Sequence, residues 1–313
     1  MSACVLCGCE RTRPLFQSSD RLFRTTTKRF AVVRCGECGL VRLDPPPPPE
    51  ELRLYYPENY WFAPDDSAAN RLAEAYRRMV LRDHVRFVEH ALRAGPGGPL
   101  LDVGSGGGLF LGMMRERGFA VVGLDSSREA AAIAWRRQRA PSVCASLEDA
   151  PFRAGSLGAV TMFHVLEHVY DPGAYLRAAR DLLAPDGRLV VQVPNAASWQ
   201  FRILGRSWNG VDVPRHLFDF RDRDVETLLE RAGLEVVRRK YFSLRDNPAG
   251  LASSLAPGLD PMARRVRASG EGSAARLAKD LAYFALVAAA VPLTLVEAMC
   301  RAGSTVMIEA RRR

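Results

Sequence analysis

The sequence predicts an α/β fold, with a mostly parallel β-sheet covered by helices on both faces and a small cysteine-rich module before it. From residue 99 onward, short apolar runs alternate with helical stretches and glycine turns, an order typical of parallel sheets. Five of the seven cysteines stand in the first 38 residues, which indicates a separate module. The 313 residues are 48% hydrophobic and 25% charged, a composition that excludes wholesale disorder, collagen-like repeats and a small disulfide-stapled scaffold.

The charge of the chain is basic but dispersed. The net charge is +9, from 44 lysines and arginines against 35 acidic residues spread along the sequence. This charge is compatible with nucleic acid or an anionic membrane as a partner, yet its even spread favours an ordinary solvated surface. Residues 1–7 lack both a basic leader and an apolar core, so we expect a cytoplasmic protein with reduced cysteines.

The cysteines of the N-terminal module form two knuckles, Cys4-x-x-Cys7 and Cys35-x-x-Cys38, each followed by a glycine. A two-residue gap lets both thiolates reach one ion, and two knuckles give a tetrahedral sulfur site that suits Zn²⁺ or, less often, iron. A pair of disulfides is the alternative. Because four cysteines leave no open position, we expect residues 1–44 to be a zinc ribbon whose metal stabilises folding and takes no part in chemistry.

Residues 45–70 are predicted to be a linker. The run Pro45–Pro49 is a stiff polyproline spacer, and the segment 55–61 that follows is unusually aromatic. This segment either docks the ribbon onto the next domain or forms part of a lid over a ligand. In the second case, Tyr56 and Tyr60 are candidate substrate contacts.

The predicted central domain spans residues 71–242. It opens with apolar positions at helical spacing over 71–92, a stretch that ends in glycines. In sheets of alternating strands and helices, ligands bind beyond the carboxyl ends of the strands, so the loops after the strands are the candidate site. The predicted strands are 99–103, 120–124, 143–145, 159–163, 188–193 and 234–241.

The first of these loops is rich in glycine. Glycines at 104, 106 and 108 let the backbone turn sharply and approach a ligand closely at the start of a helix. A nicotinamide-binding fingerprint would need a glycine at position 109, where this chain has Leu109. Asp102 precedes the loop, and Asp125 ends the next strand, where its carboxylate can accept hydrogen bonds from both hydroxyls of a ribose. Considered alone, Asp125 fits a helix N-cap equally well.

The span from about Leu100 to Val237 resembles class I S-adenosylmethionine-dependent methyltransferases. Residues 102–108 match the first motif of that family, and Asp125 matches its ribose-binding acid. The segment 147–152 resembles the adenine-side segment, and 163–172 looks like the motif after the fourth strand of small-molecule methyltransferases, including ubiquinone-pathway O-methyltransferases. The resemblance implies a Rossmann-like, seven-stranded, mostly parallel sheet and S-adenosylmethionine as cofactor.

The resemblance also implies a set of cofactor-binding residues. The chain departs from the family at Ser146, where an aspartate is often found near the adenine amino group. The expected cofactor contacts are Asp102, Gly104, Ser105, Gly106, Gly108, Asp125, Ser126, Ser146, Leu147, Phe163 and His164.

A narrower resemblance covers most of the chain. The ribbon, the Tyr-Tyr-Pro stretch and the pattern Trp208-x-x-x-Asp212-x-Pro214-Arg215-His216 together resemble zinc-ribbon methyltransferases that act on sugars, glycoconjugates or other secondary metabolites. Aromatic residues in this segment could form the floor of a pocket, with an arginine meeting an anionic group. Trp208 and Arg215 therefore join Tyr56 and Tyr60 as candidate substrate contacts; the alternative is a packed loop whose arginines face water.

Two histidines are candidate general bases. A hydroxyl must lose its proton during methyl transfer, which requires a base with a pKa near neutrality, the natural range of histidine. His168 follows the fourth strand of the predicted sheet and His216 follows the fifth. Each also has a purely structural alternative, since His168 could cap or pack a helix and His216 could satisfy a hydrogen bond in its loop.

The C-terminal part, residues 243–313, is longer than this fold requires. It contains an apolar, helix-like stretch at 277–299 before a final antiparallel strand expected at 304–310. The uncharged run 281–296 is short for a bilayer crossing, and Pro292 interrupts it. Three uses of this stretch stay open: packing over the domain, formation of a homodimer, and peripheral contact with a membrane.

The function predicted from these patterns is methyl transfer from S-adenosylmethionine to a hydroxyl, or to an activated carbon, of a small molecule, sugar or glycoconjugate. RNA methylation is one alternative, prompted by the ribbon and the basic charge. However, the chain has Phe163-His164-Val165-Leu166 where base-amino methyltransferases carry an Asn/Asp/Ser-Pro-Pro-aromatic motif. A binding protein that has lost catalysis is the other alternative, which the intact glycine loop and Asp125 disfavour.

Overall fold

The computed structural model describes residues 3–56, 68–267, 270 and 272–312, and for residues 68–72 the backbone alone. The chain forms two compact units that interleave along the sequence. We call them the ribbon unit, comprising Met1–Tyr60, Pro194–Val225 and Asp246–Val306, and the sheet unit, comprising Trp61–Val193, Glu226–Arg245 and Met307–Arg313. These units cut across the linear domain boundaries expected after residues 44, 70 and 242.

The sheet unit is built on a seven-stranded sheet in the order β10-β11-β8-β7-β4-β5-β6. Strand β4 pairs in parallel with β5 and β7, and the pairs β5–β6 and β7–β8 are also parallel, whereas β11 runs antiparallel to β10. The predicted α/β fold with a seven-stranded, mostly parallel sheet is confirmed. The strands are β4 (Leu100–Val103), β5 (Val121–Asp125), β6 (Ser142–Cys144), β7 (Leu157–Phe163), β8 (Leu183–Pro194), β10 (Leu234–Lys240) and β11 (Thr305–Arg312).

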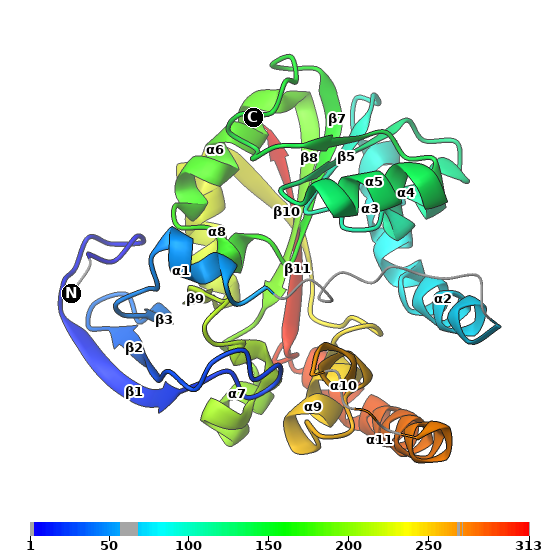
Figure 1. The fold of residues 1–313 in the computed structure, drawn as a ribbon. Helices are drawn as coiled ribbons and strands as arrows, with labels where there is room; N and C mark the ends of the chain where they lie inside the picture. Colours follow the sequence, from blue (N-terminus) through cyan, green and yellow to red (C-terminus); the bar gives the residue numbers. More distant parts are fainter. Residues whose placement is uncertain (1–2, 57–67, 268–269, 271, 313) are drawn as a thin grey trace. The chain divides into compact units, whose positions relative to one another are not determined.

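Helices cover both faces of this sheet (Figure 1): α3, α4 and α5 lie on one side, and α6 and α8 on the other. The single helix expected over 71–92 is two helices, α2 and α3, with Leu81 between them. The helices are α2 (Ala68–Val80), α3 (Arg82–Ala94), α4 (Leu109–Arg115), α5 (Arg128–Gln138), the short 3₁₀ helix η2 (Leu166–His168), α6 (Pro172–Leu182) and α8 (Asp222–Arg231).

The core of the sheet unit explains why its strands read as continuous apolar runs. All four residues of β4 are buried, because helices cover the sheet on both faces. Val85 and Val88 of α3 and Leu111 and Met114 of α4 belong to the same buried cluster as Leu100 of β4. This packing fixes the carboxyl ends of β4, β5 and β7, where the candidate site residues stand.

The ribbon unit contains a four-stranded antiparallel sheet in the order β1-β2-β3-β9. Its last strand, β9, comes from the predicted central domain, so the N-terminal ribbon is completed by a distant part of the chain. The elements of this unit are β1 (Thr12–Ser18), β2 (Phe30–Cys35), β3 (Val41–Leu43), β9 (Phe218–Asp219), α1 (Pro49–Arg53), α7 (Trp199–Leu204), η3 (Gly205–Ser207), η4 (Asn209–Val211), α9 (Asn247–Leu255), α10 (Pro261–Val266) and α11 (Ser273–Met299).

Helix α11 is longer than the uncharged run in the sequence indicates. It has 27 residues and contains Pro292. Among the described residues, α11 is the one helix that is long and apolar enough to cross a membrane, judged by length and composition. Its most apolar stretch of 18 residues has a mean hydropathy of 1.9, and 28% of that stretch is buried. The expectation that this stretch is too short for a crossing is therefore wrong as far as length goes. The expected final strand is confirmed as β11.

Candidate functional site

The loop after β4 has a conformation that requires glycine. Gly104 has a φ of +71° and Gly108 a φ of +74°. A Cβ atom at Gly104 would lie 2.7 Å from Val165 Cγ2, and one at Gly108 would lie 2.7 Å from Ala134 Cβ. Both the left-handed backbone and these close approaches exclude larger residues. The loop thus forms a tight glycine turn at the carboxyl end of β4.

Asp125, at the end of β5, fastens this loop. Its Oδ2 accepts a hydrogen bond from Gly106 N at 2.9 Å, and its Oδ1 accepts one from Ser127 N at 2.8 Å. Burial raises the pKa of this carboxyl, and the two amide donors oppose the rise. A carboxylate has about four acceptor positions, so Asp125 can hold the loop and still accept hydrogen bonds from a ligand. Ser126, directly after it, is exposed.

Ser105, in the same loop, provides a test of whether a polar cofactor fits. Within the described part of the chain, its buried hydroxyl oxygen makes no hydrogen bond. A buried polar atom without a partner is unfavourable, and a ligand that pairs with it removes that cost. The Ser105 hydroxyl and the glycine loop therefore fit the nucleoside cofactor that the resemblance implies.

Ser146 and Leu147 follow β6, and the structure adds Asp149 to them. Ser146 Oγ donates to Asp149 Oδ2 at 2.7 Å, while the Leu147 amide donates to Tyr175 Oη at 3.4 Å. Asp149 thus places a carboxylate beside Ser146, where the family often carries an aspartate. Asp149 belongs to the predicted adenine-side segment 147–152, but its pairing with Ser146 depends on a turn that the sequence pattern does not specify.

Asp102 is buried at the end of β4 and accepts a hydrogen bond from Thr161 Oγ1 at 2.6 Å. Burial raises the pKa of Asp102 to about 7; the Thr161 hydroxyl opposes this rise, and the charge of Asp125 adds to it. The folded protein therefore binds a proton here that the unfolded chain releases near the ordinary carboxyl pKa. The contribution of Asp102 to folding stability consequently falls as the pH rises from about 4 to about 7.

The direction of this pH dependence of folding stability can be tested. Asp102→Asn removes the titration, so the free energy of unfolding of the variant should decline less between pH 5 and pH 8 than that of the wild type. Urea unfolding at constant ionic strength measures it, with Glu148→Gln, an exposed site, as the control. Equal pH slopes for Asp102→Asn and the wild type would contradict the burial of a titrating carboxyl.

The carboxyl end of β7 carries Phe163 and His164. Phe163 packs edge-on against Phe110, with ring centroids 5.0 Å apart. His164 has a φ of +57°, a strained conformation for a non-glycine residue. Its Nε2 lies 3.0 Å from the side-chain amide nitrogen of Gln192, and its Nδ1 lies 3.1 Å from Glu167 Oε1. Because the amide nitrogen donates, Nδ1 carries the proton and donates to Glu167, so His164 is held on both sides and suits positioning better than proton transfer.

The two candidate bases lie in different units. His168 is the last residue of η2 in the sheet unit and is partly exposed. One of its ring nitrogens lies within 4.8 Å of a carboxylate oxygen of Glu167. His216, in the ribbon unit, is 9% exposed, and its Nδ1 lies 2.8 Å from the carbonyl oxygen of Gly210. A carbonyl only accepts, so Nδ1 carries the proton and Nε2 carries the lone pair that a base needs.

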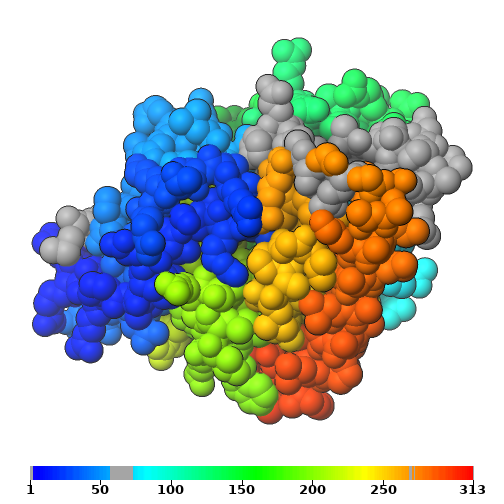
Figure 2. Space-filling model, turned by 60° about the horizontal axis from the view of Figure 1, so that its bottom comes forward, coloured from blue at the N-terminus to red at the C-terminus, as the bar shows by residue number. Residues whose placement is uncertain are grey.

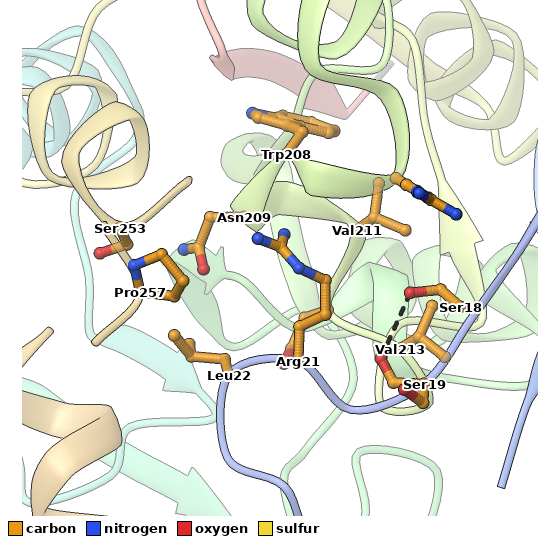
Figure 3. Close-up of a pocket in the computed structure, with 12 residues that line it drawn as sticks. Ser18, Ser19, Arg21, Leu22, Trp208, Asn209, Val211, Val213, Ser253 and Pro257 are labelled. Carbon is orange, nitrogen blue, oxygen red and sulfur yellow. Dashed lines mark hydrogen bonds between the residues drawn. The ribbon is translucent and has the colours of Figure 1, made fainter. Parts of the chain in front are cut away.

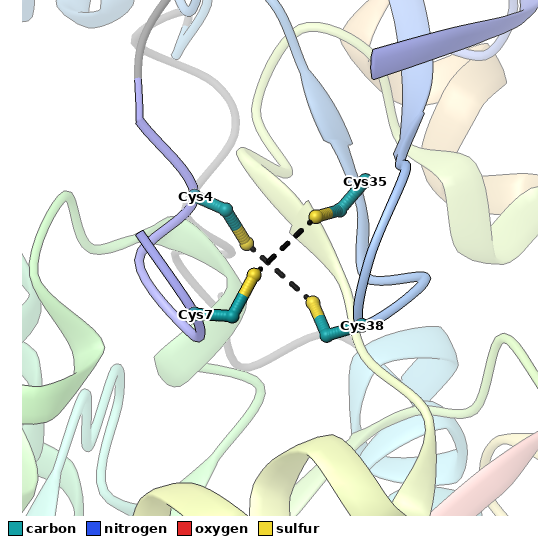
Figure 4. Close-up of side chains that lie close together, drawn as sticks. All are labelled: Cys4, Cys7, Cys35 and Cys38. Atoms are coloured by element: carbon teal, nitrogen blue, oxygen red, sulfur yellow. Dashed lines mark hydrogen bonds between the residues drawn. The ribbon is translucent and has the colours of Figure 1, made fainter. Parts of the chain in front are cut away.

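The four predicted metal ligands converge in the ribbon unit (Figure 4). The sulfurs of Cys4, Cys7, Cys35 and Cys38 all lie within 4.8 Å of one another. Cys4 Sγ and Cys38 Sγ are 3.6 Å apart, and Cys7 Sγ and Cys35 Sγ are 3.5 Å apart. Four sulfurs bound to Zn²⁺ at about 2.3 Å would be separated by about 3.8 Å, so this donor set fits a tetrahedral ion.

Arg221 supports this cluster from outside it. Its Nη2 donates to the carbonyl oxygen of Cys38 at 2.6 Å, and Asp224 accepts from the same guanidinium at 2.6 Å and 2.8 Å. A Cβ atom at Gly39 would lie 2.8 Å from Arg221 Nη1, so the glycine of the knuckle makes room for the arginine. No spacing rule points to Arg221, which lies far from the knuckles in sequence.

Arg215 lies in a buried ion-pair network in the ribbon unit. Its guanidinium bonds Asp20 through Nη1 and Nη2, each at 3.0 Å, and Asp212 through Nε at 2.9 Å and Nη2 at 2.5 Å. Nη1 also donates to the Tyr55 carbonyl oxygen, and the guanidinium carbon lies 4.5 Å from the Phe23 ring centroid. The side chain is 0% exposed, so its role is to join the ribbon segment to the 212–216 turn, in place of the predicted substrate contact.

Loss of this network should destabilise the protein. Burial alone would raise the pKa values of Asp20 and Asp212, but the Arg215 charge and hydrogen bonds hold both below the ordinary range. We expect Arg215→Ala to lower the free energy of unfolding by about 3–5 kcal/mol, because it leaves buried carboxylates unpaired. Urea unfolding measures this against Arg202→Ala, an exposed arginine of α7. A loss below about 1 kcal/mol, as for a surface pair, would contradict the network.

The other predicted substrate residues fall in different places. Trp208 is 3% exposed and lines a small cavity, with its ring 5.4 Å from that of Phe201 between centroids. Tyr56 is partly exposed at the end of the first described segment. Tyr60 lies outside the described residues.

Comparison with known proteins decides the family. Residues 72–239, slightly more than half of the chain, match the family described as "Methyltransferase domain". The chain belongs to this family. The methyltransferase is 30% identical over 181 residues to the ubiquinone biosynthesis O-methyltransferase of Pseudomonas aeruginosa, a match that covers 54% of this chain and 77% of the relative.

Two further proteins show the range of similarity. The ubiquinone biosynthesis O-methyltransferase of Cronobacter sakazakii is 32% identical to the methyltransferase over 176 residues, covering 52% of this chain and 72% of the relative. The crystal structure of geranyl diphosphate C-methyltransferase from Streptomyces coelicolor A3(2) is 19% identical, with a TM-score of 0.49 over 74% of this chain and 76% of that one.

The family and the site geometry agree on the enzyme class. The chain is an S-adenosylmethionine-dependent methyltransferase, and its sheet unit carries the glycine loop and the acid of β5 that the resemblance predicted. The sequence did not reveal Asp149 and Gln192 as neighbours of predicted site residues. For Gln192 a signal existed, because an amide inside the apolar strand β8 needs a polar partner.

Proposed function

We propose that this methyltransferase transfers a methyl group to a hydroxyl oxygen, or to an activated carbon, of a small molecule, sugar or glycoconjugate in secondary metabolism, acting in the cytoplasm. The observation that carries the proposal is the glycine loop after β4, which Asp125 holds through Gly106 N and which fits the nucleoside part of S-adenosylmethionine. The names of its relatives, ubiquinone biosynthesis O-methyltransferases, support a hydroxyl as the acceptor.

The proposed chemistry assigns each group one task. When bound, S-adenosylmethionine supplies an electrophilic methyl group on a sulfonium. Asp125 and the glycine loop would hold its nucleoside part, and Ser105 would pair with one of its polar atoms. His168 or His216 takes up the proton that the acceptor hydroxyl loses as the new oxygen–carbon bond forms. Much of the acceleration comes from positioning the acceptor in line with the methyl carbon.

We also propose that Zn²⁺ occupies the four-cysteine cluster as a structural ion. The support is the fit of the sulfur separations to a tetrahedral site and the lack of an open coordination position in a four-thiolate set. Cys38→Ser should lower the zinc content, measured by atomic absorption, from about one per chain and should make the ribbon unit more sensitive to protease. Cys300→Ser, at an exposed cysteine outside the cluster, is the control. Full zinc content in Cys38→Ser would contradict the site.

The test of function is transfer of labelled methyl groups from S-adenosylmethionine into a host-cell extract, which is then separated into small-molecule, lipid, RNA and protein fractions. Label in the small-molecule or lipid fraction that depends on Asp125 is the expected result. Label in RNA would overturn the proposal and would make the ribbon and the basic surface the recognition apparatus.

A further inference from the structure

A small cavity in the ribbon unit brings together three segments that are distant in sequence (Figure 3). Its open volume is about 20 Å³, which is room for about one water-sized group. The ribbon supplies 18–22, the loop after α7 supplies 206–213, and α9 with the turn after it supplies the rest. The lining residues are Ser18, Ser19, Arg21, Leu22, Arg206, Trp208, Asn209, Val211, Asp212, Val213, Ser253 and Pro257.

Two guanidinium groups share this cavity without a counter-ion. Among the described residues, no carboxylate lies within 4.0 Å of Arg21 or Arg206. Arg21 donates to the carbonyl oxygen of Ser207 at 2.6 Å, and its pKa is lowered by burial and then by the charge of Arg206. Asp212 also lines the cavity, but both of its oxygens are bound by Arg215. Since Arg215 is shared by Asp212 and Asp20, these five groups together carry one net positive charge, which an anion would neutralise.

The walls around these charges are polar on one side and flat or apolar on the other. Figure 3 shows the side chain of Arg21 reaching from the ribbon segment toward the wall formed by Trp208 and Asn209. The indole ring of Trp208 is fixed, because Gly210 approaches it so closely that a Cβ atom there would lie 2.3 Å from Trp208 Cζ2. Leu22 and Pro257 complete an apolar rim. An oxyanion attached to an apolar or planar body matches this lining.

We propose that Arg21 and Arg206 bind an oxygen of a carboxylate or phosphate group of the methyl acceptor at the mouth of this cavity. The open volume admits one oxygen atom of such a group, so the rest of the acceptor would lie outside the cavity. The proposal rests on the proposed function only in taking the bound anion to be part of the acceptor.

The site itself is tested by binding of two probes, inorganic phosphate and benzoate, measured by calorimetry on the full-length protein at constant ionic strength. We expect at least one probe to bind, and its dissociation constant to rise tenfold or more in both Arg21→Gln and Arg206→Gln. Arg202→Gln, which changes the same charge at an exposed position outside the cavity, should bind like the wild type. The probe that binds distinguishes a phosphate from a carboxylate. No binding of either probe, or equal loss in Arg202→Gln, would overturn the site.

The link to the acceptor is tested separately by the labelled-methyl experiment. If the anion belongs to the acceptor, Arg21→Gln and Arg206→Gln should lower the label in the acceptor fraction while their binding of S-adenosylmethionine stays equal to that of the wild type. Unchanged label with lost probe binding would overturn the assignment to the acceptor. No label from the wild type would contradict the proposed function, and the anion site would then be judged on the calorimetry alone.

Helix α11 carries a second inference on independent grounds, because its exposed side is apolar. Its buried face includes Tyr283, Thr294 and Glu297, and two of these bond within the ribbon unit: Tyr283 Oη lies 3.1 Å from Ser253 Oγ, and Glu297 Oε2 accepts from Gln200 at 2.8 Å. The exposed side is apolar instead. Its large residues are Leu277, Leu281, Phe284, Leu293, Leu295, Val296 and Met299, exposed by 40–76%.

The charges around this apolar side are at its ends and are basic. Arg276 and Lys279 stand in its first two turns, and Arg301 lies two residues beyond its last residue. The acids of the helix face inward, since Asp280 pairs with Arg264 and Glu297 is buried. Figure 2 shows α11 in orange beside α9 in gold. We infer that this side lies on an anionic membrane surface, while the hydrogen bonds and packing of the inner face hold the helix to the protein so that it does not cross.

Flotation with vesicles tests this inference. The full-length protein should float with vesicles of phosphatidylcholine and phosphatidylglycerol, float less with phosphatidylcholine alone, and lose flotation in the double variant Leu281→Ser, Leu295→Ser. Val237→Ser, at an exposed apolar residue of β10, is the matched control and should float like the wild type. Absence of flotation would overturn the inference. So would light scattering that shows a dimer which the double variant converts to a monomer, since the helix would then cover a second copy.

Discussion

Asp125→Ala should weaken the binding of S-adenosylmethionine at least a hundredfold, which makes it the substitution with the largest expected effect on the cofactor site. The carboxylate does two things at once: it fastens the glycine loop through Gly106 N, and it is the acid expected to accept from the ribose hydroxyls. The truncation removes both, and it also leaves the amide of Ser127 without its acceptor. Equilibrium dialysis with labelled cofactor measures the loss directly.

A graded variant separates the two tasks of Asp125. Asp125→Asn keeps one acceptor oxygen at similar volume, so its affinity should fall between those of the wild type and Asp125→Ala. Asp171→Ala, which removes an N-cap carboxylate of α6 outside the cofactor loop, is the control for general destabilisation. Wild-type affinity in Asp125→Ala would contradict the placement of the cofactor at the β5 end.

His168→Ala should leave cofactor binding unchanged and lower kcat by about 10²–10⁴-fold, the usual contribution of a general base. The physical reason is that an acceptor hydroxyl with a high pKa attacks efficiently only as its proton leaves. The same measurement on His216→Ala distinguishes the two candidates, since the Gly210 carbonyl already fixes the His216 tautomer. Labelled-methyl turnover at saturating cofactor is the readout.

The control for the histidine series is His90→Ala, because His90 is exposed on α3 and has no assigned role. If His168 is the base, the variant should lose the acidic limb of the pH–rate profile along with its rate. Normal turnover in His168→Ala with loss in His216→Ala would transfer the role to His216. Normal turnover in both would remove histidine from the proposed chemistry.

Part of the candidate site could be predicted because its determinants are local. A two-residue gap places both cysteines of a knuckle on one ion, and glycine at 104 and 108 is required by the backbone of a single turn. Asp125 could be predicted for a related reason. Parallel strands end at one edge of a sheet, so the last residue of β5 must lie near the loop after β4. The alternation of strands and helices along the sequence also predicted the α/β fold.

Other features depend on residues that meet only in the folded chain. The sequence determined the two knuckles, the glycine loop, the acid of β5 and the strand–helix alternation, because each is set by neighbours along the chain. The tertiary structure alone decided that β9 completes the ribbon sheet, that Arg215 is enclosed by Asp20 and Asp212, and that Arg21 and Arg206 share one cavity. The reason is that long-range packing sets the burial and the pairing of charges. It therefore decides whether an arginine can bind a ligand or is already paired with buried carboxylates inside the protein.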